Sequence, residues 1–193
     1  MARPSHRDTI LCEGLKVIHE KGFAGASVRD IVRAAGVPQG SFTNHFPSKE
    51  AFGLEVLNLY FEKGRRVMDE TVRNRALPPL KRMEAYLDQV IAAHRAEGVH
   101  SGCLIGNFTA EVVEGSELLR RRLVEIHDEN RAAFAECLAE AVEAGELPAD
   151  FDVSGTAEFI VAGVQGAILL AKARREVGPL EAFRKLLFAS VLR

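Results

Sequence analysis

The sequence lacks the features that mark membrane-inserted or secreted proteins. Its longest nearly apolar segment, residues 159–171, has 13 residues and is interrupted by Gln165, whereas a membrane-spanning helix takes about 20 apolar residues. The basic and polar start, residues 1–9, is not followed by an apolar stretch of signal-peptide type. We therefore expect a cytoplasmic protein that begins with a short arm and has no membrane among its partners.

Cysteine is scarce, and nothing in its placement indicates a disulfide framework or a metal site. The three cysteines, Cys12, Cys103 and Cys137, are scattered and do not have the spacing of zinc ligands. Histidines and cysteines are never clustered, so the sequence predicts no metal and no cofactor. We expect reduced thiols, because an odd number of distant cysteines makes a poor disulfide scaffold.

Signatures of catalysis are missing as well. The sequence contains no nucleophile with a base partner, no paired carboxylates, no glycine-rich phosphate loop and no metal motif. The alternation of apolar and polar residues that is typical of strands is also absent, whereas three- and four-residue apolar spacing recurs. These patterns predict an all-α protein and make a helical enzyme the weaker alternative.

Strong charge of either sign is missing too, since the net charge is only −2. Its distribution is nevertheless uneven. Residues 1–50 carry seven basic and five acidic side chains, a local charge of +2, and the other 143 residues carry −4. Because basic groups attract nucleic-acid phosphates, this asymmetry modestly favours DNA contact at the N-terminal end.

The most informative pattern that is present predicts two short helices joined by a glycine turn, within residues 26–52. Apolar residues at i, i+3, i+4 and i+7 line one face of the first helix: Val28, Ile31, Val32 and Ala35. Ser27 is expected to cap its start, and Gly36 can adopt the left-handed conformation that ends a helix at low cost. Val37 precedes proline, and this disfavours helical backbone torsions at Val37.

The second helix is expected to start at Pro38 and to be anchored by Phe42 and Phe46. Its remaining side chains are candidates for exposure: Gln39, Gly40, Ser41, Thr43, Asn44 and His45. Two turns are too short to be stable alone, so a longer helix, from Ser48 to about residue 73, should support them. A helical hairpin in an enzyme or scaffold would give the same pattern, and these residues alone leave both interpretations open.

The order GVPQGSFTNHFPSKEAF, residues 36–52, resembles the recognition-helix signature of the tetracycline-repressor (TetR/AcrR) family of one-component regulators. Residues 10–31 also resemble that family's first two helices. The resemblance implies a nine-helix, all-α protein with a helix-turn-helix DNA-binding domain, residues 1–50, and an effector-binding and dimerisation domain, residues 51–193. It also implies a homodimeric repressor that a small-molecule effector releases from operator DNA.

Carried over by position, the resemblance assigns two groups of DNA contacts. Groove-facing residues are Gln39, Gly40, Ser41, Thr43 and His45, and phosphate contacts are Ser27, Arg29 and Lys49. Asn44 joins the first group because it lies on the same exposed side. One residue departs from the family pattern, since Thr43 stands where the family usually has tyrosine, and this leaves the operator sequence open.

Two apolar helices close the sequence, at about residues 154–177 and 179–192. They carry more apolar surface than one core needs, so we expect a four-helix dimer interface with two helices from each chain. The residues assigned to it are Phe159, Ile160, Gly163, Val164, Ala167, Phe183 and Leu187. A two-fold dimer predicts a palindromic operator. The alternative is that both helices simply form the core of a monomer.

The effector site is predicted only in outline, from apolar and polar residues on the middle helices: Phe61, Met83, Leu87, Cys103, Asn107, Phe108, His127, Asn130, Phe134 and Gln165. Cys103 is expected near the first turn of a short helix, where the helix dipole favours thiolate. Some members of the family that detect electrophiles or oxidants have a similar Gly-Cys-Leu context. A thiol-sensing repressor that uses Cys103 is therefore one alternative, against which Cys103 can be an ordinary packing residue. A separate alternative is a related binding protein in which Thr43 and the weakly basic face have lost affinity for operators.

Overall fold

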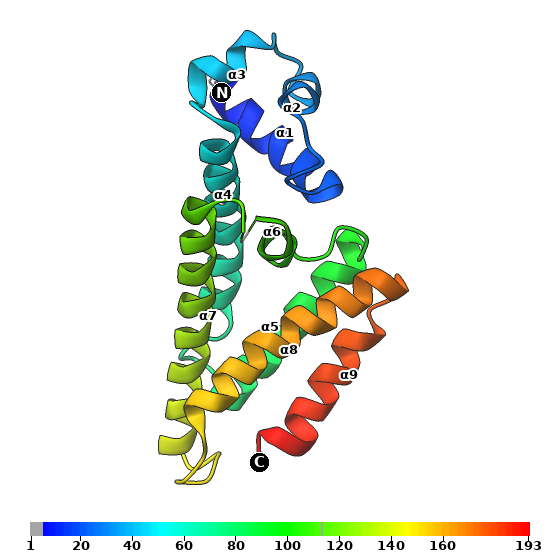
Figure 1. Cartoon of the computed structure of the whole chain (residues 1–193). Coiled ribbons are helices and arrows are strands. Elements are labelled where there is room, and N and C mark those ends of the chain that lie inside the picture. The colour runs from blue at the N-terminus through cyan, green and yellow to red at the C-terminus, as the bar shows by residue number, and fades with distance from the viewer. Residues whose placement is uncertain (1–5, 113) are drawn as a thin grey trace. The chain divides into compact units, whose positions relative to one another are not determined.

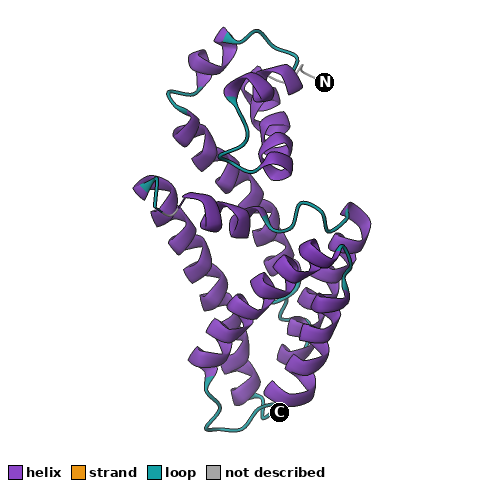
Figure 2. Cartoon of the chain, turned by 45° about the vertical axis from the view of Figure 1, so that its right-hand side comes forward, coloured by secondary structure: helices purple, strands orange, loops and turns teal. Residues whose placement is uncertain are grey.

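The computed structural model describes residues 6–112 and 114–193, which form helices and loops with no strand among them (Figure 2). Nine α-helices occur in this part of the chain, as expected from the sequence, and a short π-helix, Leu187–Val191, follows the last one. The helices are α1 His6–Lys21, α2 Val28–Ala34, α3 Gly40–His45, α4 Lys49–Glu70, α5 Pro79–Glu97, α6 Leu104–Val112, α7 Glu117–Glu143, α8 Val153–Arg174 and α9 Gly178–Leu186 (Figure 1).

Several boundaries differ from the expected ones by a few residues. α3 begins at Gly40, two residues after Pro38, and α4 ends at Glu70 instead of continuing to about residue 73. The segment expected to be a short arm is helical from His6 onward. The rest of that arm, residues 1–5, lies outside the described residues, as does Val113.

By its internal contacts the chain divides into two compact units. The first contains the described residues up to Glu62 together with Leu104–Val124, and the second contains Lys63–Cys103 and Glu125–Arg193. The division expected at residue 50 therefore does not coincide with the compact units. The first unit also includes residues 49–62 of α4, all of α6 and the start of α7. In α4, Phe52, Val56 and Leu57 are fully buried.

The core of the first unit contains an aromatic cluster around Phe52. Its ring lies 5.2 Å from the Phe42 ring and 4.8 Å from the Phe46 ring, centroid to centroid. Gly14 of α1 makes room for it, since a Cβ there would lie 2.4 Å from the Phe52 ring. Because α3 has only six residues, its position depends on this aromatic packing rather than on its own hydrogen bonds.

In the second unit α5, α7, α8 and α9 share one apolar core. Met83 and Leu87 of α5 are buried with Phe134 of α7, Ile160 of α8 and Leu180 of α9. α8 and α9 pack closely along their length (Figure 1). Gly163 permits this approach, because a Cβ at this position would lie 2.2 Å from the Phe183 ring.

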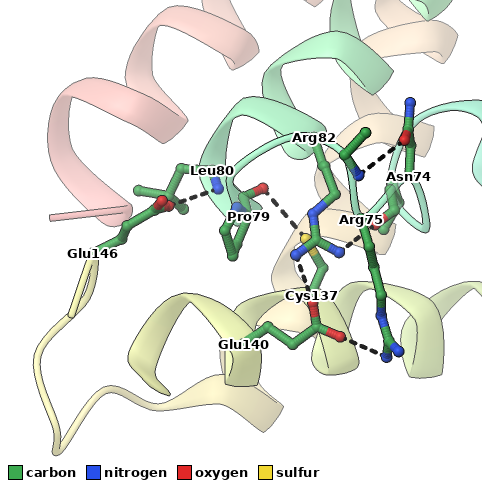
Figure 3. Close-up of polar contacts among 10 residues, drawn as sticks. Asn74, Arg75, Pro79, Leu80, Arg82, Cys137, Glu140 and Glu146 are labelled. Carbon is green, nitrogen blue, oxygen red and sulfur yellow. Dashed lines mark hydrogen bonds and ion pairs between the residues drawn. The ribbon is translucent and has the colours of Figure 1, made fainter. Parts of the chain in front are cut away.

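A polar cluster fastens the start of α5 to α7 (Figure 3). Arg82, only 4% exposed, donates hydrogen bonds to the Glu140 carboxylate and to the Val72 carbonyl. Glu140 also accepts from Arg75 at 2.8 Å. The hydrogen bonds from Arg82 and Arg75 hold the pKa of Glu140 below its ordinary value, so this side chain is a carboxylate at neutral pH.

Candidate nucleic-acid interface and effector unit

The helix-turn-helix begins with a capping box at the start of α2. The Asp30 N–H donates to Ser27 Oγ at 3.1 Å, and the Ser27 N–H donates to Asp30 Oδ2 at 3.1 Å. This confirms Ser27 as the N-cap. Hydrogen bonds from Ser27 and from Lys21 hold the pKa of Asp30 far below its ordinary value. Asp30 Oδ1 forms ion pairs with Lys21 Nζ at 3.1 Å and with an Arg33 guanidinium nitrogen at 3.0 Å.

The turn between α2 and α3 has the conformation that the sequence predicts. Gly36 has φ +65°, a left-handed conformation that side chains disfavour. The Val37 N–H then donates to the Val32 carbonyl at 3.1 Å, which closes the end of α2. The chain can therefore reverse direction between two very short helices and present the second one on the surface.

α3 has one buried side and one hydrophilic side. Phe42, and Phe46 just beyond the helix, are buried. The residues expected to face DNA lie on the other side: Gln39, Gly40, Thr43, Asn44 and His45 are exposed and Ser41 is half-buried. The Thr43 hydroxyl donates to the Gly40 carbonyl at 3.1 Å. Thr43 is smaller than the tyrosine that the family usually has at this position, and its hydroxyl forms a hydrogen bond within its own helix.

The residues assigned to phosphate contacts are also at or near the surface. Ser27 and Arg29 are exposed, and Lys49 at the start of α4 is half-buried. Lys49 Nζ lies 4.7 Å from the centroid of the Phe23 ring and 3.5 Å from the Ala24 carbonyl oxygen. Burial lowers the pKa of Lys49, and the Glu111 carboxylate acts in the opposite direction. Nothing in the sequence indicated this neighbour.

The expected effector residues are divided between the two compact units. Phe61, Asn107 and Phe108 belong to the first, and the other seven, Met83, Leu87, Cys103, His127, Asn130, Phe134 and Gln165, belong to the second. Phe61 and Phe108 are buried, as are Met83, Leu87 and Phe134. Most of the aromatic and aliphatic residues expected at the effector site are therefore core residues. The polar residues of the second unit are more informative about such a site.

Cys103 has a specific polar neighbour. It lies immediately before α6, and Gln165 Nε2 of α8 approaches its sulfur at 3.6 Å. Tyr86, which the sequence analysis missed, packs edge-on against Phe134 with ring centroids 5.2 Å apart. Burial raises the pKa of the Tyr86 phenol, and the charge of Cys103 acts in the same direction. Tyr86 lies three positions after Met83 on α5, and this spacing alone does not distinguish it from a core residue.

His127 and Asn130 of α7 are half-buried. Burial lowers the pKa of His127, while Glu158 and Asp128 act in the opposite direction. Within the residues that the structure describes, no group of three His, Cys, Asp or Glu side chains is arranged to hold a metal ion.

The residues expected at a dimer interface divide into two sets. Phe159 is exposed and Gly163 and Phe183 are half-buried, whereas Ile160, Val164, Ala167 and Leu187 are covered by the chain's own helices. Large apolar side chains on the outer side are instead Leu169 (65% exposed), Leu170 and Leu186 (61% exposed). α8 is long and apolar enough to cross a membrane, by length and composition only. The number of consecutive apolar residues in the sequence gave no such indication. Of the most apolar 18 residues of α8, 33% are buried within the chain.

A capped, glycine-punctuated helix pair with an exposed hydrophilic flank, followed by a helical body, defines a helix-turn-helix DNA-binding regulator. Residues 10–56 match the family model described as bacterial regulatory proteins, tetR family, and residues 79–187 match the tetracyclin repressor-like C-terminal domain. The second match alone covers more than half of the chain. The protein belongs to the TetR family of transcriptional regulators and is a DNA-binding regulator, not an enzyme.

Named relatives agree with this family. The chain is 37% identical to the HTH-type transcriptional repressor DhaR of Mycobacterium sp. (strain GP1), covering 100% of this chain and 95% of that protein. It is 30% identical to the HTH-type transcriptional repressor NemR of Escherichia coli (strain K12), covering 91% and 88%. Among solved structures, the regulatory protein TetR from Rhodobacter sphaeroides has a TM-score of 0.88 at 31% identity, covering 93% of this chain and 95% of that one.

Proposed function

We propose that the protein is a homodimeric repressor that occupies a palindromic operator and is released by a small-molecule effector in the cytoplasm. The single observation that carries the operator part is the exposed side of α3, opposite the buried Phe42 and Phe46. The names of the relatives DhaR and NemR, each an HTH-type transcriptional repressor, support repression as the regulatory outcome.

In this proposal the first compact unit reads DNA, and the second binds effector and forms the dimer. Gln39, Ser41, Thr43, Asn44 and His45, with Gly40 allowing close approach, would face base edges. Ser27, Arg29 and Lys49 would contact phosphates. Because the Ser27 hydroxyl already takes part in the capping box, its phosphate contact would share an atom that also fixes the start of α2.

The dimer is supported by apolar surface that the chain leaves uncovered on α8 and α9. Leucines such as Leu169 and Leu186 are more than half exposed, and large exposed apolar patches mark association sites. Phe159, Gly163 and Phe183 would form part of the interface, while Ile160, Val164, Ala167 and Leu187 would support it from inside. Two-fold pairing of these helices would set the spacing of the two recognition helices and hence of the operator half-sites.

Selection of bound sequences from random duplex DNA tests the operator proposal directly. We expect an inverted repeat to be enriched. Lys49→Gln should weaken binding to all sequences and reduce the dependence of log affinity on log salt by only part of the roughly 0.9 expected for one fully engaged phosphate contact. Gln39→Ala should instead change the preferred base at one position in each half-site. A library that returns no enriched sequence would favour the alternative of a related protein without operator affinity.

Thiol sensing is a second candidate for the effector function, favoured by the contact between Cys103 and Gln165. A solved structure of the relative E. coli NemR, with a TM-score of 0.84, is described as its reduced form. This description supports testing thiol chemistry in the present protein. In this version Cys103 itself reacts with an electrophile, and the adduct displaces the neighbouring α8 side chain. Tyr86, Met83, Leu87 and Phe134 would surround the reacting region.

The thiol proposal predicts that a mild electrophile such as N-ethylmaleimide lowers operator affinity of the wild type at least about tenfold, an allosteric coupling of typical size. Cys103→Ser should bind operator normally and lose this response. Cys12→Ser is the matched control, because Cys12 is the exposed thiol and its removal should leave the response intact. If the Cys103→Ser protein still responds, the effector must act elsewhere.

A further inference from the structure

The turn between α1 and α2 is held by a residue far along the chain, Glu111 of α6. The Ala24 N–H donates to Glu111 Oε2 at 2.8 Å, across 87 positions of sequence. Gly22 has φ +79°, and a Cβ at this position would lie 2.5 Å from Glu111 Oε1. A side chain at residue 22 would therefore displace the carboxylate, and the glycine provides the space in which Glu111 sits.

Lys49 contacts the same residue, Ala24, through the peptide group that follows. Its ammonium lies 3.5 Å from the Ala24 carbonyl oxygen, which can accept a hydrogen bond from it. The backbone of Ala24 thus donates to Glu111 and accepts from Lys49, so two side chains of opposite charge contact the same residue. The Phe23 ring beneath Lys49 packs on Phe108 of α6, with ring centroids 5.1 Å apart.

These contacts give α6 two separate connections to the turn between α1 and α2, one apolar and one charged. The apolar connection through Phe108, which is almost completely buried, does not involve the charge of Glu111. The carbonyl oxygen of a glutamine amide could accept the Ala24 N–H equally well. The negative charge at residue 111 is therefore not needed for this hydrogen bond, but it acts on the neighbouring Lys49.

We propose that Glu111 sets operator affinity by competing with a DNA phosphate for Lys49. This inference rests on the proposed role of Lys49 as a phosphate contact. In the free protein the Lys49 ammonium lies near the Phe23 ring and the Ala24 carbonyl oxygen, and the negative charge of Glu111 stabilises it. On DNA a phosphate must draw the ammonium away from this field and must itself approach a carboxylate of like charge, which opposes binding.

Glu111→Gln separates the charge from the hydrogen bond. We expect the variant to keep the fold, to bind operator about three- to tenfold more tightly near 0.1 M salt, and to show a steeper salt dependence by up to about 0.9, the contribution of one fully engaged phosphate contact. A structural role of Glu111 alone would leave the salt dependence unchanged. Affinity is measured by fluorescence anisotropy at several salt concentrations.

The matched control is Glu114→Gln, an exposed acid three positions further along, which changes the net charge by the same amount. The second control is Glu111→Gln in a Lys49→Gln background, where the gain in affinity should disappear. Equal gains in Glu111→Gln and Glu114→Gln, or a gain that persists without Lys49, would mean a general charge effect and overturn the inference.

The same variants are measured on a duplex of unrelated sequence at low salt, because phosphate contacts act on any sequence. Tighter non-specific binding by Glu111→Gln supports the inference even if no operator is selected, in which case only the proposed operator function fails. Unchanged binding on both kinds of duplex overturns the inference while leaving operator recognition intact.

Discussion

Replacing Leu169 by glutamate should convert the protein to single chains at micromolar concentration and lower operator affinity by roughly a hundred- to ten-thousandfold, the usual gain from engaging two linked sites. Leu169 is the most exposed large apolar residue of α8 among the described residues, at 65%. A carboxylate placed in an apolar interface would lose its water without gaining a partner, which is costly. Sedimentation velocity reports the mass, and anisotropy with operator DNA reports the affinity.

The matched control for this change is Leu77→Glu. Leu77 is also an exposed leucine, at 40%, but it lies in the loop between α4 and α5 and outside α8 and α9. It should keep both the dimer mass and the affinity. A dimer that survives Leu169→Glu combined with Leu186→Glu would exclude the proposed four-helix interface, because the two most exposed leucines of that surface would then carry charge.

Replacing Phe52 by alanine should abolish operator binding while leaving the dimer mass unchanged. Phe52 is fully buried and contacts both Phe42 and Phe46. Removing a buried phenylalanine costs about 3–5 kcal/mol, and α3 is too short to remain helical without its support. Hydrogen exchange should show lost protection in the described residues up to Glu62, with α8 and α9 still protected.

A graded variant, Phe52→Leu, tests the cause of this loss. It retains part of the buried volume and should recover part of the stability and of the DNA affinity, since smaller losses of volume leave smaller cavities. If Phe52→Ala bound operator as well as the wild type, α3 would not depend on the aromatic core. The assignment of α3 as a helix positioned by Phe42, Phe46 and Phe52 would then be wrong.

The helix-turn-helix could be predicted because its signals are local. Ser27 caps the helix that begins at the next residue, and Gly36 adopts the left-handed conformation within the same short turn. The buried positions of α3 follow from a spacing of four residues between Phe42 and Phe46. Each of these features depends on neighbours only a few positions away, so the order of residue types was sufficient to predict them.

The contacts of Glu111 could not be predicted in the same way. Glu111 and Ala24 are 87 positions apart, and neither residue belongs to a motif. The inclusion of α6 in the first compact unit likewise depends on long-range packing, such as that of Phe108 on Phe23. A division into domains at residue 50 followed the end of the recognizable motif rather than the limits of the packed core.

α8 illustrates both sides of this distinction. Its sequence determined that the helix is apolar on more than one side and that Gly163 permits a close neighbour. The sequence could not decide which apolar residues the chain covers itself, because an all-round apolar helix has no periodicity that distinguishes its faces. Only the tertiary structure showed Ile160 and Val164 buried and Leu169 exposed, because burial depends on which other helices pack against each face.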